Sequence, residues 1–144
     1  MSVWITLFTI EELNELARTS LIGHLGIRFT GFGDDYLQAT MQVDHRTMQP
    51  FGILHGGASV ALAESLGSIA ANQCIDQSQK FCVGLEINAN HIRTVRSGLV
   101  TGTASPIHIG QSTQVWEIKI RDEQDRLVCV SRFTVAVLDK KKDL

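Results

Sequence analysis

The chain has 144 residues, of which 44% are hydrophobic, and its formal net charge at pH 7 is −2. This length and composition predict one domain, residues 1–144, and the scattered charges exclude the basic footprint of a nucleic-acid-binding protein. No stretch is long and apolar enough to span a bilayer, and the N-terminus lacks a signal-peptide pattern. We therefore expect a cytoplasmic protein without membrane contact. We interpret the run Lys140-Lys141-Lys142 as a solvated terminus.

The chain begins with a capping-box pattern, Thr9 followed by Glu12. It predicts a short helix that buries Leu13, Leu16 and Ala17 and ends before the next glycines. Residues 27–31 resemble a strand and residues 33–35 a turn. Residues 37–43 alternate between apolar and polar side chains, which predicts a strand with one wet face.

Residues 44–54 form a predicted loop, and residues 55–74 a predicted helix about 27 Å long. This helix is apolar nearly all round, so we expect other elements to cover most of it. Strands are predicted at 82–91, 99–105, 114–121 and 127–138, with a polar turn at 122–125. Consecutive strands joined by short turns favour an antiparallel sheet. The predicted class is therefore α+β, with a sheet that wraps one long helix.

The three cysteines are an odd number without a C-x-x-C pair: Cys74, Cys82 and Cys129. This pattern is typical of small buried side chains in a reducing compartment. No histidine accompanies any of them in a recognisable pattern, which makes a cysteine nucleophile the weaker alternative.

Glu64 is the most informative residue of the chain. Histidine aside, it carries the only full charge between Arg46 and Asp76. An unpaired buried carboxylate is costly, so its presence in an apolar helix predicts a functional role. The alternative, an ordinary surface glutamate, is disfavoured by the apolar residues around it.

The start of the same helix offers unpaired backbone N–H groups and a partial positive charge. Gly56 and Gly57 would leave these groups uncovered, so that they stabilise a developing oxyanion. Gln49 and His55 lie just upstream and can add donors. Each feature also has a simpler interpretation, because His-Gly-Gly can be a structural turn and Gln49 a loop residue.

Ser68 follows Glu64 by one helical turn and can hold a water beside the carboxylate. A small packing residue is the alternative interpretation of Ser68. The combination of donors at a helix start with one acid two to three turns deeper is stronger evidence for a functional site than any of these features alone.

Three segments of the chain resemble the hotdog-fold acyl-CoA thioesterases of the phenylacetate-pathway and 1,4-dihydroxy-2-naphthoyl-CoA type. These are residues 49–58, 62–65 and 83–91, and the similarity extends over about residues 26–138. The resemblance implies a curved antiparallel sheet around a central helix, a homodimer or dimer of dimers, and no cofactor or metal.

The resemblance also implies thioester hydrolysis at a site shared between subunits. The Gly56 N–H, with Gln49 and His55, would polarise the thioester carbonyl. Glu64 would act as a base on a water held with Ser68, or attack directly. About 11 Å of helix separate Gly56 from Glu64, so one chain cannot easily supply both to one thioester.

Coenzyme A contacts are implied at the sheet edge and the following loops: Gly84, His91, Arg93, Thr94, His108, Gly110, Gln111 and Ser112. Ordinary surface charge is the alternative interpretation of Arg93. Two rival functions remain, a non-catalytic acyl-CoA-binding module and a hydratase or dehydratase that uses Asp44 and His45. The preferred acyl group stays open.

Overall fold

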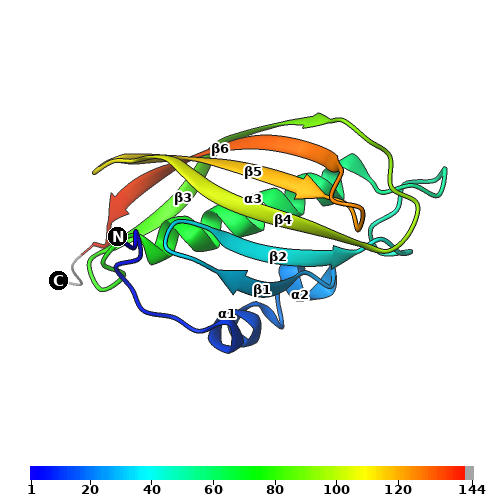
Figure 1. The fold of residues 1–144 in the computed structure, drawn as a ribbon. Coiled ribbons are helices and arrows are strands. Elements are labelled where there is room, and N and C mark those ends of the chain that lie inside the picture. Colours follow the sequence, from blue (N-terminus) through cyan, green and yellow to red (C-terminus); the bar gives the residue numbers. More distant parts are fainter. Residues whose placement is uncertain (142–144) are drawn as a thin grey trace.

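The computed structural model describes residues 1–141, so Lys142 of the predicted lysine terminus lies outside the described residues. Six strands form one antiparallel sheet in the order β1-β2-β4-β5-β6-β3. They are β1 (Arg28–Phe32), β2 (Leu37–Gln42), β3 (Lys80–His91), β4 (Leu99–Ile109), β5 (Thr113–Arg121) and β6 (Leu127–Asp139). Figure 1 shows the curved sheet with the long helix α3 (Gly56–Gln73) lying along its inner face.

The strand alternation predicted from the sequence is confirmed. In β2 the side chains of Leu37, Ala39 and Met41 are buried, because they face the helix. In β5, Trp116 is fully buried and its indole N–H donates to Oε1 of Gln114 at 2.9 Å. The inner face of the sheet therefore supplies most of the core.

Helix α3 follows the predicted bounds closely, with His55 as its N-cap. Leu62, Leu66 and Ala70 are fully buried against the sheet. A Cβ on Gly102 of β4 would lie 2.6 Å from Cδ1 of Leu66, so this glycine allows the helix to approach the sheet closely. The prediction that most of α3 is covered is confirmed, because nine of its 18 residues are buried and only Gly57 and Glu64 are exposed.

Helix α1 (Ile10–Ala17) has the predicted capping box, with Thr9 Oγ1 accepting from the Glu12 N–H at 3.1 Å. Leu13 and Ala17 are buried, as predicted, but Leu16 is 69% exposed. The prediction for Leu16 is wrong because α1 packs on β1 along one narrow stripe.

Two differences from the sequence prediction exceed a shift of one or two residues. A short helix α2 (Leu21–His24) was not predicted, and Ser20 caps it by accepting from the Ile22 N–H at 3.2 Å. Strand β4 continues to Ile109 rather than ending at residue 105, because a register shift between Pro106 and His108 accommodates the proline. None of the helices within residues 1–141 is long and apolar enough to cross a membrane.

Candidate active site

The first turn of α3 leaves one backbone donor free. His55 Nδ1 accepts a hydrogen bond from the Gly57 N–H at 2.8 Å, so the prediction that both glycine amides are uncovered is wrong for Gly57. The Gly56 N–H has no acceptor within residues 1–141. Because His55 accepts through Nδ1, its Nε2 is the ring nitrogen left to donate. The Gly56 N–H is therefore the backbone donor that this turn leaves free.

Gln49 is held by its own loop. Its Oε1 accepts from the Phe51 N–H, and its backbone N–H donates to the Ile53 carbonyl at 2.9 Å. Since Oε1 is engaged, the Nε2 amide group is left to donate outward. The loop thus orients Gln49 as a second donor beside the helix start.

A cleft of about 280 Å³ brings five predicted residues together. Its lining includes Gln49, Gly56, His91, Arg93 and Thr94. The His91 ring lies against the helix start, because a Cβ on Gly56 would be 3.0 Å from His91 Nε2.

Ser59 also lines this cleft, and sequence reasoning missed it. It is buried one turn after Gly56, so the i, i+3 spacing on α3 was the available signal.

Glu64 is exposed in the single chain, so its predicted burial is wrong. It lines a groove of about 320 Å³ that Leu21 of α2 also borders. Its carboxylate forms no hydrogen bond or ion pair within residues 1–141. Ser68 is half-buried one turn further along, and no partner within residues 1–141 engages its hydroxyl.

The predicted coenzyme A residues separate into two groups within one chain. His91, Arg93 and Thr94 lie at the end of β3. The second group comprises His108 near the end of β4 and Gly110, Gln111 and Ser112 in the β4–β5 turn. Thr113 pairs with Ala136, which pairs with Val83, so this turn lies near the start of β3. Eight residues at 3.3 Å give about 26 Å between Val83 and His91.

Gly84 lies near the start of β3, beside the acid. A Cβ on Gly84 would be 2.9 Å from Oε1 of Glu64 and 3.0 Å from the ring of Phe133. Phe133 is a buried β6 residue that sequence reasoning did not single out, because nothing local links it to α3.

The cysteines are buried and free, as predicted. Burial, followed by the proximity of Cys82, raises the pKa of Cys74 to about 12, and burial raises the pKa of Cys82 to about 11. Burial also raises the pKa of Cys129. These thiols are protonated at neutral pH, which disfavours a cysteine nucleophile. No cluster of three or more His, Cys, Asp or Glu within residues 1–141 could hold a metal ion.

The hydratase alternative is also disfavoured. Hydrogen bonds from Arg46 lower the pKa of Asp44 to about 2, and the two side chains approach to 2.7 Å. Asp44 is therefore ionised and engaged at neutral pH, so it is poorly suited to deliver a proton.

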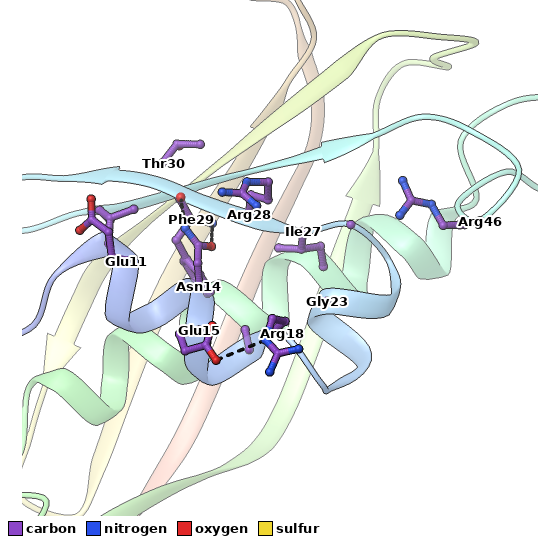
Figure 2. Close-up of a pocket in the computed structure, with 13 residues that line it drawn as sticks. Glu11, Asn14, Glu15, Arg18, Gly23, Ile27, Arg28, Phe29, Thr30 and Arg46 are labelled. Atoms are coloured by element: carbon purple, nitrogen blue, oxygen red, sulfur yellow. Dashed lines mark hydrogen bonds and ion pairs between the residues drawn. The ribbon is translucent and has the colours of Figure 1, made fainter.

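A larger hollow lies elsewhere, between α1 and β1 (Figure 2). It has a volume of about 800 Å³ and contains none of the predicted site residues. Part of its charged lining is paired, with Arg18 3.2 Å from Glu15. We place the candidate active site at α3, where the free donors and the acid lie.

Comparison with known proteins identifies the family of the chain. The model of the thioesterase superfamily matches residues 51–129. The 1,4-dihydroxy-2-naphthoyl-CoA hydrolase of Escherichia coli is 54% identical over 136 residues, 94% of this chain and 99% of the relative. The proofreading thioesterase EntH of Cronobacter turicensis is 49% identical over 142 residues, 94% of this chain and 98% of the relative.

A solved structure is also similar to this chain. The crystal structure of a thioesterase from Haemophilus influenzae is 55% identical and covers 95% of each chain, with a TM-score of 0.93. The predicted hotdog fold is confirmed by this agreement. The chain therefore belongs to the thioesterase superfamily and is a thioesterase with the hotdog fold.

Proposed function

We propose that the protein hydrolyses acyl-CoA or aroyl-CoA thioesters to the free acid and coenzyme A. The observation that carries this proposal is the free Gly56 N–H at the start of α3, with the Gln49 amide in the same cleft. Two donors directed at one carbonyl oxygen stabilise the negative charge that develops during thioester hydrolysis. The names of the Escherichia coli and Cronobacter relatives support this substrate class and this reaction.

Glu64 is the proposed base or nucleophile. As a base it takes a proton from water while the water oxygen attacks the carbonyl carbon. The tetrahedral intermediate then expels the coenzyme A thiolate, and the proton returns to the sulfur. As a nucleophile, Glu64 forms a mixed anhydride that water cleaves afterwards. Ser68 can position the water in either route.

The acid and the donors lie in different clefts of one chain, since Glu64 and Gly56 line separate hollows. About 11 Å of helix separate them. A second copy of the chain resolves this separation if its α3 runs antiparallel to the first. We therefore propose a homodimer in which the Glu64 of one subunit faces the Gly56 N–H of the other.

Strand β3 is the proposed dimer contact, because it forms an open edge of the sheet. A two-fold axis pairs β3 antiparallel with its copy. Glu64 lies beside Gly84 and Gly56 beside His91. Glu64 of one copy and Gly56 of the other come together when Gly84 of the first lies opposite His91 of the second. This places the axis midway, beside Ile87 and Asn88.

The same axis joins the two groups of proposed coenzyme A residues. It brings the His91 end of one β3 toward the Lys80 end of the other, which lies near the β4–β5 turn. Arg93 and Thr94 of one subunit and the residues His108 to Ser112 of the other would then bind one coenzyme A. A dimer of dimers is compatible with this arrangement.

The substitution Glu64→Gln tests the catalytic assignment. It keeps the size of the side chain but removes the carboxylate, so kcat on an aryl-CoA thioester should fall by at least about 100-fold. Steady-state kinetics on the purified protein measure this, and Glu117→Gln on the opposite face of the sheet serves as the matched control. Activity of Glu64→Gln within threefold of the unchanged protein would contradict the assignment.

The same experiment separates the enzyme from a binding module. A module that only binds acyl-CoA would show no turnover in the unchanged protein, and Glu64→Gln would not alter its affinity for the substrate. The enzyme, in contrast, should retain substrate binding in Glu64→Gln while losing turnover.

A further inference from the structure

We propose that Gly84 is a positioning residue that sets the direction of the Glu64 carboxylate. This inference rests on the proposed function, because it assigns Gly84 a role only through Glu64. It concerns a residue of β3 that would not itself touch the reacting atoms.

The contact geometry around Gly84 leaves no room for a side chain. A Cβ there would lie 2.9 Å from Oε1 of Glu64 and 3.0 Å from both Cε2 and Cζ of Phe133. The carboxylate and the aromatic ring therefore both lie against the strand backbone at Gly84. Glu64 has no hydrogen-bonding or ionic partner within residues 1–141, so this contact is what restricts its position.

Phe133 forms a fixed wall of this contact. Its side chain is 1% exposed, and its ring also packs on α3, where a Cβ on Gly67 would lie 2.5 Å from Cδ1. Gly67 follows Glu64 by three residues on the helix. The ring is thus held between a helix glycine and a strand glycine, and it cannot shift without disturbing the core.

The backbone of β3 is irregular at the same point. Gly84 pairs with Val135, but Glu86 pairs with Thr134, which leaves Leu85 as the bulged residue. Bulges bend a strand and redirect side chains, and they occur often beside active sites. Here the bulge and the glycine together bring the backbone against the acid.

The two neighbours would respond differently to a methyl group on Gly84. Phe133 is locked in the core, whereas Glu64 is exposed and its side chain is flexible. The substitution Gly84→Ala should therefore displace the carboxylate more than the ring. We expect kcat to fall by at least about 30-fold, since a displacement of 1 Å can cost about 100-fold. The KM should stay within about threefold, and the Tm should drop by less than about 8 °C.

The experiment compares Gly84→Ala with Gly31→Ala in β1, where the nearest atom would be 3.9 Å from the new Cβ. Both variants are also made in the Glu64→Gln background. If Gly84 acts through the carboxylate, Gly84→Ala should lower the residual activity of Glu64→Gln by less than about threefold. Gly31→Ala should leave kcat unchanged in either background.

Different failures have different meanings. If Gly84→Ala retains kcat within threefold while Glu64→Gln is inactive, the positioning role is overturned and the proposed function stands. Full additivity of the two substitutions also overturns the positioning role. If Glu64→Gln itself is active, the proposed function fails. If Gly84→Ala does not fold, Phe133→Leu serves as the second variant, because it removes the aromatic ring that packs against Gly84. A kcat of Phe133→Leu within threefold would then overturn the inference.

Discussion

The two edges of the sheet end in opposite ways. At β1, the side chain of Asn14 from α1 closes the outer side of the strand at Phe29 (Figure 2). Its Nδ2 donates to the Phe29 carbonyl at 3.0 Å, and its Oδ1 accepts from the Phe29 N–H at 2.9 Å. At β3, twelve residues form an edge without a neighbouring strand within residues 1–141, and Leu85 is 62% exposed.

This difference determines at which edge a further strand can join the sheet. The Asn14 amide presents the same donor and acceptor that a further strand would present, so β1 is closed to pairing. The β3 edge remains available and carries Gly84 and His91, which lie beside Glu64 and Gly56. The proposed second subunit is therefore added on the side of the sheet that holds the catalytic groups.

Blocking the open β3 edge should have the largest effect on assembly and activity. Leu85→Lys places a charge on the exposed bulge of β3, where edge lysines discourage strand pairing. We expect dissociation into monomers at micromolar concentration and a loss of at least about tenfold in kcat/KM. Sedimentation velocity and activity as a function of protein concentration measure both.

The matched control is Leu16→Lys on α1, because Leu16 is exposed to a similar degree, 69% against 62% for Leu85. It lies on the closed side of the sheet and should leave both assembly and activity unchanged. A Leu85→Lys protein that stays dimeric and fully active would refute the assignment of β3 as the contact.

Removing the Asn14 side chain from the closed β1 edge should have a smaller effect, on stability alone. Asn14→Ala leaves the Phe29 N–H and carbonyl without their partners, so the free energy of unfolding should fall by about 1–3 kcal/mol. Urea denaturation measures this loss, and kcat of the folded protein should not change. Asn14→Asp should also destabilise the protein, since a carboxylate can accept from the N–H but repels the carbonyl oxygen. A stability within 0.5 kcal/mol of the unchanged protein for Asn14→Ala would show that water satisfies this edge equally well.

Much of the fold could be predicted because its signals are local. The capping box at Thr9, the alternation of 37–43 and the limits of α3 each follow from neighbouring residues. Helix α2 escaped prediction because four residues are too short for a periodic pattern. The exposure of Leu16 depends on how far β1 extends beneath α1, which no local pattern encodes.

The candidate site was predicted less completely, for a physical reason. Gln49, Gly56 and His91 meet in one cleft, as a functional reading of the motifs suggests. The burial of Glu64 was mispredicted because an apolar helix sequence does not reveal which of its positions the rest of the chain covers. The contact of Gly84 with Glu64 and Phe133 joins three distant segments, so only the folded structure reveals it.

The central claim, an active site shared between two subunits, can be tested with a proline at Gly56, and an alanine there controls for the new Cβ, which would lie 3.0 Å from His91 Nε2. Gly56 is the first residue of α3, where proline is favoured and the lost N–H has no intrahelical acceptor. The preceding His55 has φ −69° and ψ 130°, a conformation that proline accepts in its neighbour. Gly56→Pro should therefore fold and lose the oxyanion donor, while Gly56→Ala adds a Cβ but keeps the N–H.

The most direct measurement mixes Glu64→Gln and Gly56→Pro subunits, each inactive alone, by joint refolding or coexpression. In a mixed dimer one site carries both defects and the other carries none. Half of the dimers are mixed, so about a quarter of the unmodified activity should return. Activity no greater than that of the two separate variants would contradict the shared site and place Glu64 and Gly56 in the same chain's active site.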